Sequence, residues 1–183
     1  MTDRRRRIVI GVAVLVAVQA VIILLYRSGD SGRRKPAAPR FPGERVSAAL
    51  DAQALVLERQ DGTSWKVDAL RGRPVVLHFW ATWCRPCRDE LPTLLAQRER
   101  IRRAGGELAL VSVDDDWAEI RGFFGGAVPD EVSRAIDGDY RTITTGVLPE
   151  TLIVDAAGGL AGRVRGPRDW RSTSAATFLD SLE

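Results

Sequence analysis

The fold of this chain is decided by VVLHFWATWCRPC, residues Val75 to Cys87. The first six residues are nearly all apolar, which is typical of a strand buried on both faces. A helical pattern follows the second cysteine, and its apolar residues are Leu91, Leu94, Leu95 and Ile101. A Cys-x-x-Cys pair therefore lies at a strand-to-helix junction. Unpaired N–H groups and the helix dipole favour a thiolate at such a helix start.

The two cysteines of this pair are the only ones in the chain. We expect Cys84 to be the attacking thiolate, because it lies at the helix start. Cys87 lies one turn later, within reach of a mixed disulfide formed on Cys84. The spacing predicts a redox disulfide, Cys84–Cys87, that cycles between dithiol and disulfide. We expect no metal and no organic cofactor for this chemistry.

Two other uses of the cysteine pair stay open at this point. A zinc site needs about four ligands, and the chain offers two Cys and one His, His78. A purely structural disulfide is the second alternative, although so short a loop removes little chain entropy.

The charge of the chain is concentrated near its start. The net charge is +3 over 183 residues, and the excess lies in Arg4 to Arg7 and in Arg33, Arg34 and Lys35. The remainder is mixed in sign, so we expect no nucleic-acid partner. The length suits one folded domain with accessory segments.

A nineteen-residue uncharged run, residues 8–26, follows a basic tail at residues 1–7. A bilayer span needs roughly 20 apolar residues, so the run is predicted to be a single transmembrane anchor. A cleaved signal peptide is the alternative, with a possible site at Val18-Gln19-Ala20. The apolar residues continue from Val21 to Leu25, which favours an uncleaved anchor.

The arginines before the span predict a cytoplasmic N-terminus. Residues 27–44 are rich in Gly, Ser and Pro and are expected to form a flexible linker. Residues 45–183 then form the folded domain. We expect this domain on the extracytoplasmic, or periplasmic, side of a bacterial cytoplasmic membrane, attached through residues 8–26.

The elements of the folded domain follow from periodicity and turn residues. They indicate an α/β fold, a β-α-β unit followed by a hairpin and a helix. Three aspartates, Asp114 to Asp116, are expected to form a solvated cap rather than a metal site. The predicted strands are 50–58, 64–67, 74–80, 107–113, 150–155 and 160–164, and the predicted helices are 85–104, 117–124, 139–143 and 170–182.

The stretch from Phe79 to Pro92 resembles the membrane-anchored thioredoxin-like proteins of the TlpA/ResA/CcmG (DsbE) group. The lead-in from Asp61-Gly62 to Gly72 is similar to that group as well. The segment Gly146 to Asp155 looks like its cis-proline segment, and Gly158-Gly159 followed by Gly166 looks like its ending. The resemblance covers about residues 45 to 183.

This resemblance implies a thioredoxin fold with an added N-terminal β-hairpin. It also implies a thiol-disulfide oxidoreductase that usually works as a reductant outside the cytoplasm. The implied partners are client proteins with cysteine pairs, such as apocytochrome c or copper-site assembly factors of cytochrome oxidase. The implied electron donor is a membrane protein of the CcdA/DsbD type.

The expected client-binding residues flank the cysteines in sequence or by resemblance. Trp83 is expected to face the substrate, and Pro86 suits the first helical turn. Arg85 either favours the thiolate through its charge or is simply solvated. Leu148 and Pro149 match the cis-proline position of the group, where the neighbouring backbone accepts a client strand. Pro92 matches the kink of the active-site helix.

Two further titratable residues are candidates for proton transfer. Glu90 lies one helical turn after Cys87 and matches a glutamate that ResA-like proteins place near the active site. It is expected to accept a proton from Cys87, and the alternative is a solvated helix glutamate. His78 is either a satisfied core residue or a proton relay to Cys87.

Two rival functions come from other classes. A copper-binding assembly chaperone would use Cys84, Cys87 and His78, since copper(I) favours soft ligands. A tethered, redox-inert binding domain would use none of this chemistry.

Overall fold

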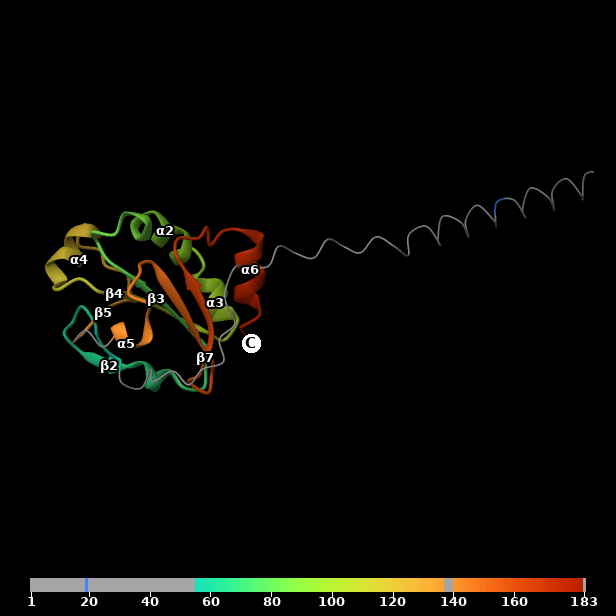
Figure 1. Cartoon of the computed structure of the whole chain (residues 1–183), viewed down its shortest axis with the longest axis horizontal. Coiled ribbons are helices and arrows are strands. Elements are labelled where there is room, and N and C mark those ends of the chain that lie inside the picture. The colour runs from blue at the N-terminus through green and yellow to red at the C-terminus, as the bar shows by residue number, and fades with distance from the viewer. Residues whose placement is uncertain (1–18, 20–54, 137–139, 183) are drawn as a thin grey trace, which may run out of the picture. The chain divides into compact units, whose positions relative to one another are not determined.

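The computed structural model of the chain describes residues 19, 55–136 and 140–182. The described part is built on a seven-stranded mixed sheet with the order β2-β1-β5-β4-β3-β6-β7 (Figure 1). The strands are β1 Val56–Glu58, β2 Ser64–Lys66, β3 Val75–Trp80, β4 Glu107–Ser112, β5 Val132–Ala135, β6 Glu150–Val154 and β7 Leu160–Arg165. The helices are η2 Val67–Leu70, α2 Arg85–Leu95, α3 Arg98–Arg103, α4 Trp117–Phe123, α5 Tyr140–Ile143 and α6 Thr173–Asp180.

Strand β3 is central, and all six of its residues are buried. It pairs in parallel with β4 and antiparallel with β6. Its side chains alternate between two cores. Val76 and Trp80 pack with α2 and α4, whereas Leu77 and Phe79 pack with the N-terminal hairpin and α5. Figure 1 shows α2 and α4 on one side of the sheet and α5 on the other. The predicted buried strand is therefore confirmed.

The predicted N-terminal hairpin is confirmed as β1 and β2, within the residues described. Gly62 takes a positive φ of 82° in the turn that joins them, a conformation that glycine adopts without steric cost. The hairpin extends the sheet through β1, which pairs antiparallel with β5. Strand β5 itself, residues 132–135, was not predicted. It is short, contains Ser133 and Arg134, and forms through pairing with β4 and β1 rather than through local pattern.

The helix predicted over residues 85–104 is two helices, α2 and α3. Pro92 lies inside α2 and has no N–H for the helical ladder. Just after it the chain tightens, because the Gln97 N–H bonds to the Leu94 carbonyl at 2.8 Å, an i to i−3 bond. Helix α3 then ends at a glycine with positive φ, Gly105, as predicted.

The last helix is shorter than predicted, beginning at Thr173 instead of Trp170. Ser172 caps it by accepting the Ala175 N–H at 3.3 Å. Trp170 precedes the helix and is fully buried. Leu179 is buried as expected, and Phe178 packs against the same core while partly exposed.

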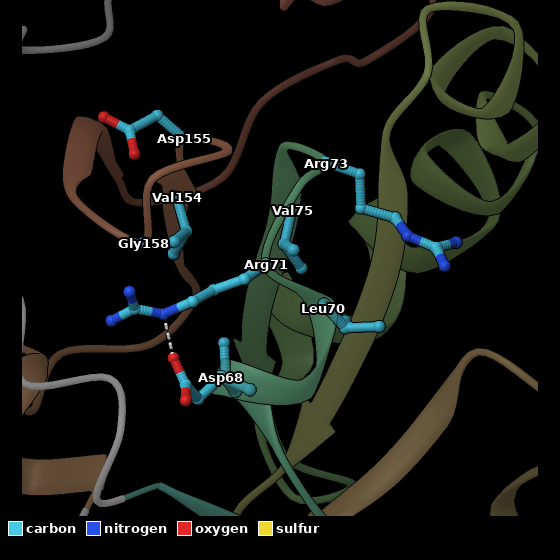
Figure 2. Close-up of a pocket in the computed structure, with 9 residues that line it drawn as sticks. Asp68, Leu70, Arg71, Arg73, Val75, Val154, Asp155 and Gly158 are labelled. Carbon is cyan, nitrogen blue, oxygen red and sulfur yellow. Dashed lines mark hydrogen bonds and ion pairs between the residues drawn. The ribbon is translucent and has the colours of Figure 1, made fainter.

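A small pocket lies at the end of β3 that is farthest from the cysteines. Val75 begins the strand here, and Val154 ends β6 beside it. Figure 2 shows Arg71 extending toward Gly158 while it pairs with Asp68. The guanidinium thus fills the space beside the glycine and holds η2 against the β6–β7 turn.

The predicted anchor, residues 8–26, lies outside the described residues except for Gln19. Within residues 19, 55–136 and 140–182, no helix has the length and apolar character needed to cross a membrane.

Candidate active site

Cys84 and Cys87 form a disulfide in this structure, with their Cα atoms 5.3 Å apart. Cys84 is the N-cap residue of α2, and Cys87 lies in its first turn. The side chain of Cys84 is 7% exposed, whereas that of Cys87 is fully buried. The predicted pair is therefore brought together, with one sulfur at the surface and the other behind it.

Backbone hydrogen bonds within the loop and to α2 hold Cys84. The Cys84 N–H donates to the Ala81 carbonyl at 3.1 Å, and the Arg88 N–H donates to the Cys84 carbonyl at 3.1 Å. The second bond closes the first turn of α2. Attack on a client therefore starts from a cysteine with a fixed backbone.

Asp114 anchors the same loop from the neighbouring strand. It is buried, and its carboxylate accepts the Thr82 N–H at 3.0 Å and the Thr82 hydroxyl at 2.7 Å. The Ser112 hydroxyl donates to it at 2.6 Å. The expectation that Asp114 is part of a solvated cap is wrong. Asp116 alone caps α4, accepting the N–H groups of Ala118 and Glu119.

Glu90 is buried, and the alternative of a solvated helix glutamate is wrong. One carboxylate oxygen, Oε1, accepts a hydrogen bond from the indole N–H of Trp170. The other, Oε2, is buried and has no hydrogen-bond partner in the described structure. Burial raises the pKa of Glu90 to about 7, although the Trp170 hydrogen bond, the backbone N–H of Arg168 and the charge of Arg168 lower it. Such a carboxyl exchanges protons near neutral pH.

His78 is fully buried on β3, on the same side of the sheet as Val76 and Trp80. Its Nδ1 lies 2.9 Å from the Thr151 hydroxyl, and its Nε2 has no hydrogen-bond partner in the described part of the chain. Burial lowers the pKa of His78 to about 3, so the ring is neutral. His78 is therefore a core residue in which only one of the two ring nitrogens, Nδ1, has a hydrogen-bond partner among the described residues.

The Leu148–Pro149 peptide bond is cis, as the resemblance implied. Glu150 pairs with Phe79 across β6 and β3. Pro149 therefore lies level with Trp80, at the edge of the sheet from which the cysteine loop departs. Leu148 is partly buried and packs against the core cluster that contains both cysteines. These two predicted residues are thus brought to the end of the sheet from which the cysteine loop departs.

Two large apolar side chains next to predicted site residues are exposed. Trp83 is 69% exposed, next to Cys84, and Val147 is 62% exposed, next to Leu148. Arg85 and Pro86 are exposed in the first turn of α2. Val147 was not singled out from the sequence.

Glu150, directly after the cis proline, is a second buried carboxylate that the sequence did not single out. It accepts the Thr145 N–H at 2.7 Å and the Thr145 hydroxyl at 2.8 Å. Arg163 of β7 pairs with its other oxygen and also donates to the Ile143 carbonyl at 3.0 Å. These contacts fix the segment that leads to Pro149.

The metal-site alternatives require at least three clustered ligands. Within residues 55–136 and 140–182, no three or more His, Cys, Asp or Glu side chains are close enough to hold a metal ion. Cys84, Cys87 and His78 thus do not form such a group in the disulfide form.

A sequence model described as the AhpC/TSA family matches residues 48–163. Two relatives are named thiol-disulfide oxidoreductase ResA. The protein from Bacillus subtilis (strain 168) is 28% identical over 67% of this chain and 63% of its own length. The protein from Bacillus thuringiensis (strain Al Hakam) is 28% identical over 80% of this chain and 86% of its own length.

Solved structures show the same fold at lower identity. A thiol:disulfide interchange protein DsbE from Chlorobium tepidum has a TM-score of 0.61 at 22% identity, covering 76% of this chain and 97% of that one. The thioredoxin domain of a Bacteroides vulgatus thiol-disulfide oxidoreductase has a TM-score of 0.62 at 17% identity, covering 76% of this chain and 99% of that one. The expected thioredoxin-like α/β fold is confirmed.

Proposed function

This chain belongs to the AhpC/TSA family and is a thiol-disulfide oxidoreductase, and we propose that it is a membrane-tethered reductase of protein disulfides. The observation that carries the proposal is the asymmetric cysteine pair. Cys84 reaches the surface at the start of α2, and Cys87 is fully buried one turn inside. That arrangement suits attack by the first sulfur and resolution by the second.

The reaction starts from the dithiol form. The Cys84 thiolate attacks one sulfur of a client disulfide, forms a mixed disulfide and releases the other client sulfur as a thiolate, which takes up a proton. Cys87 then loses its proton and attacks the Cys84 sulfur, releasing the second client sulfur as a thiolate, which also takes up a proton. The client gains two electrons and two protons, and the chain is left as the Cys84–Cys87 disulfide seen here.

Glu90 is the proposed acceptor of the Cys87 proton. Residues three apart on a helix have Cβ atoms about 5–6 Å apart, so Glu90 lies one turn from Cys87. Its pKa of about 7 lets it take a proton in its ionised form and release it again. Trp83, Val147 and Leu148 would bind the client beside the disulfide.

The proposed clients are proteins with cysteine pairs outside the cytoplasm, among them apocytochrome c or cytochrome oxidase assembly factors. The proposed donor that restores the dithiol is a membrane protein of the CcdA/DsbD type. The proposed location rests on the uncharged run 8–26 and the arginines before it. These assignments extend the resemblance of the sequence to the TlpA/ResA/CcmG group.

Client trapping tests the proposed function in cells. A Cys87→Ala variant cannot resolve the mixed disulfide, so clients should accumulate on Cys84 as adducts that dithiothreitol releases. The Cys84→Ala, Cys87→Ala double variant is the control and should trap none. Adducts equal in both variants, or none in either, would contradict the proposal.

Thiol labelling tests the proposed location. A membrane-impermeant thiol reagent is added to intact cells, or to spheroplasts where there is an outer membrane, after mild reduction. Labelling of Cys84 before lysis is expected. If labelling appears only after lysis, the folded domain faces the cytoplasm.

A further inference from the structure

Trp170 connects the C-terminal part of the chain to the active-site helix. It lies between β7 and α6, and its indole N–H donates to the Glu90 carboxylate. Its backbone N–H donates to the Thr93 hydroxyl at 3.4 Å, one turn further along α2. Figure 1 shows this C-terminal segment running beside α2. The tryptophan is therefore fixed to the helix at two points.

The hydrogen bond from Trp170 makes the two carboxylate oxygens of Glu90 different. Oε1 is occupied by Trp170, whereas Oε2 is buried without a partner in the described structure. Burying a carboxylate oxygen without a hydrogen-bond partner costs free energy. Such an oxygen in a folded protein therefore calls for an explanation, and a catalytic role is one. The indole also restricts the rotation of the carboxyl group, because Trp170 is itself fully buried.

We propose that Trp170 is a positioning residue for proton transfer: its indole N–H holds Oε1 of Glu90 and leaves Oε2 free to exchange a proton with Cys87. The inference rests on the proposed role of Glu90. It adds a residue that lies 80 positions from Glu90 in the sequence and acts on Cys87 through Glu90.

The electrostatic surroundings of Glu90 support this role. Burial raises the pKa of Glu90, and the Trp170 hydrogen bond is the largest of the influences that lower it. Arg168, from the segment after β7, lowers it further through its backbone N–H and its charge, although this N–H makes no hydrogen bond with Oε2. Two further buried titratable groups on this side of the sheet are Cys87, on the same helix, and His78 of β3, which is neutral. The charged residues of α2 (Arg85, Arg88 and Asp89) and those flanking Trp170 (Asp169 and Arg171) are exposed. Loss of the indole N–H should therefore favour the protonated carboxyl.

The first test titrates Glu90 itself in the oxidised protein, where no thiol ionises. Carboxyl 13C NMR should give a higher Glu90 pKa in Trp170→Phe than in the parent. We expect a rise of about one pH unit, a tenfold change in the protonation equilibrium. The matched control is Trp117→Phe, which also loses an indole bond to a carboxylate, at Glu58 and 2.7 Å. An unchanged or lower Glu90 pKa in Trp170→Phe overturns the inference.

A second test uses the parent protein, so it does not depend on whether Trp170→Phe folds. The indole N–H proton resonance of Trp170 should move with a midpoint of about 7, the pKa of Glu90, and should not move in Glu90→Gln. If the resonance is constant across that pH range, Trp170 does not sense Glu90 and the inference fails.

Kinetics distinguish this inference from the proposed function. In Trp170→Phe, the pH profile of mixed-disulfide resolution should shift upward by the same amount as the Glu90 pKa. In a Glu90→Gln background, adding Trp170→Phe should give no further shift. If Glu90→Gln leaves the profile unchanged, the proposed role of Glu90 is wrong, whereas the NMR titration still decides whether Trp170 controls that carboxyl. A further shift in the Glu90→Gln background contradicts positioning through Glu90.

Discussion

Asp114 holds Thr82, two residues before Cys84, through both its backbone N–H and its hydroxyl. The carboxylate is buried at the end of β4, and the residues it holds lie at the end of β3. A parallel pair of strands thus fixes the start of the cysteine loop. The nucleophile is placed by a residue that is thirty positions away from it.

Asp114→Ala should destabilise the domain by about 2–3 kcal/mol, because it leaves the part-buried donors of Thr82 and the buried hydroxyl of Ser112 without an acceptor. Urea unfolding measures this loss. Asp116→Ala, which removes only the exposed cap of α4, is the control and should lose about 1 kcal/mol. Equal losses in the two variants would mean that Asp114 does not anchor the loop.

The reduced protein should be alkylated at Cys84 well before Cys87. Cys84, at the N-cap of α2, is 7% exposed and the helix dipole favours its thiolate, whereas Cys87 is fully buried. Iodoacetamide at mildly acidic pH, followed by mass mapping of the two sites, gives the order. Faster modification of Cys87 would reverse the roles assigned to the cysteines.

Arg85→Glu should lower the reduction potential of the cysteine pair. The positive charge beside Cys84 favours its thiolate and so the reduced form. We expect the parent between thioredoxin, about −270 mV, and DsbA, about −120 mV, and a shift on the order of 10–30 mV in the variant. Equilibration with glutathione measures both.

Arg88→Glu is the matched control for this charge. Arg88 is also exposed on α2, one turn further from the helix start, so its effect should be smaller. Equal shifts in the two variants would indicate a general charge effect. No shift in Arg85→Glu, or a shift to higher potential, would remove Arg85 from the account.

Glu90 should make the oxidised protein less stable as the pH rises from about 4.5 to about 7. Its folded pKa is raised to about 7 from 4.5, so within this window the folded state binds the proton and the unfolded state does not. The loss is at most about 3 kcal/mol, since one pKa unit is about 1.4 kcal/mol.

The difference between the parent and Glu90→Gln isolates this effect in unfolding experiments across the window. His78 acts in the opposite direction, because its folded pKa is lowered to about 3 from 6.5, and stability from His78 is lost as the pH falls through that range. The effect of His78 cancels in the comparison. A constant difference between parent and variant would mean that the Glu90 pKa is not raised.

The sequence predicted those parts of the fold and site that depend on local pattern. The buried strand β3, the cysteine pair and the Asp116 cap follow from residues close together in the chain. The position of Pro149 came from resemblance. By contrast, β5 and the break between α2 and α3 depend on pairing and on a tightened turn that periodicity does not reveal.

The supporting residues of the site were the hardest to predict. Asp114 belongs to a run of three aspartates, and nothing in the run distinguishes the buried one from the capping one. Trp170 and Glu150 were assigned to a helix and a strand, and their partners lie on other elements. Only the three-dimensional arrangement shows that each holds a segment of the active site.

The central claim is that the Cys84–Cys87 dithiol reduces protein disulfides. The most direct test mixes the fully reduced protein with insulin, without any other reductant. Mass spectrometry then counts the insulin disulfides that are lost and the Cys84–Cys87 disulfides that are formed. The account predicts one insulin disulfide reduced for each Cys84–Cys87 disulfide formed, and no reduction by Cys84→Ser. Failure of the reduced parent to reduce insulin, or equal reduction by Cys84→Ser, would contradict it.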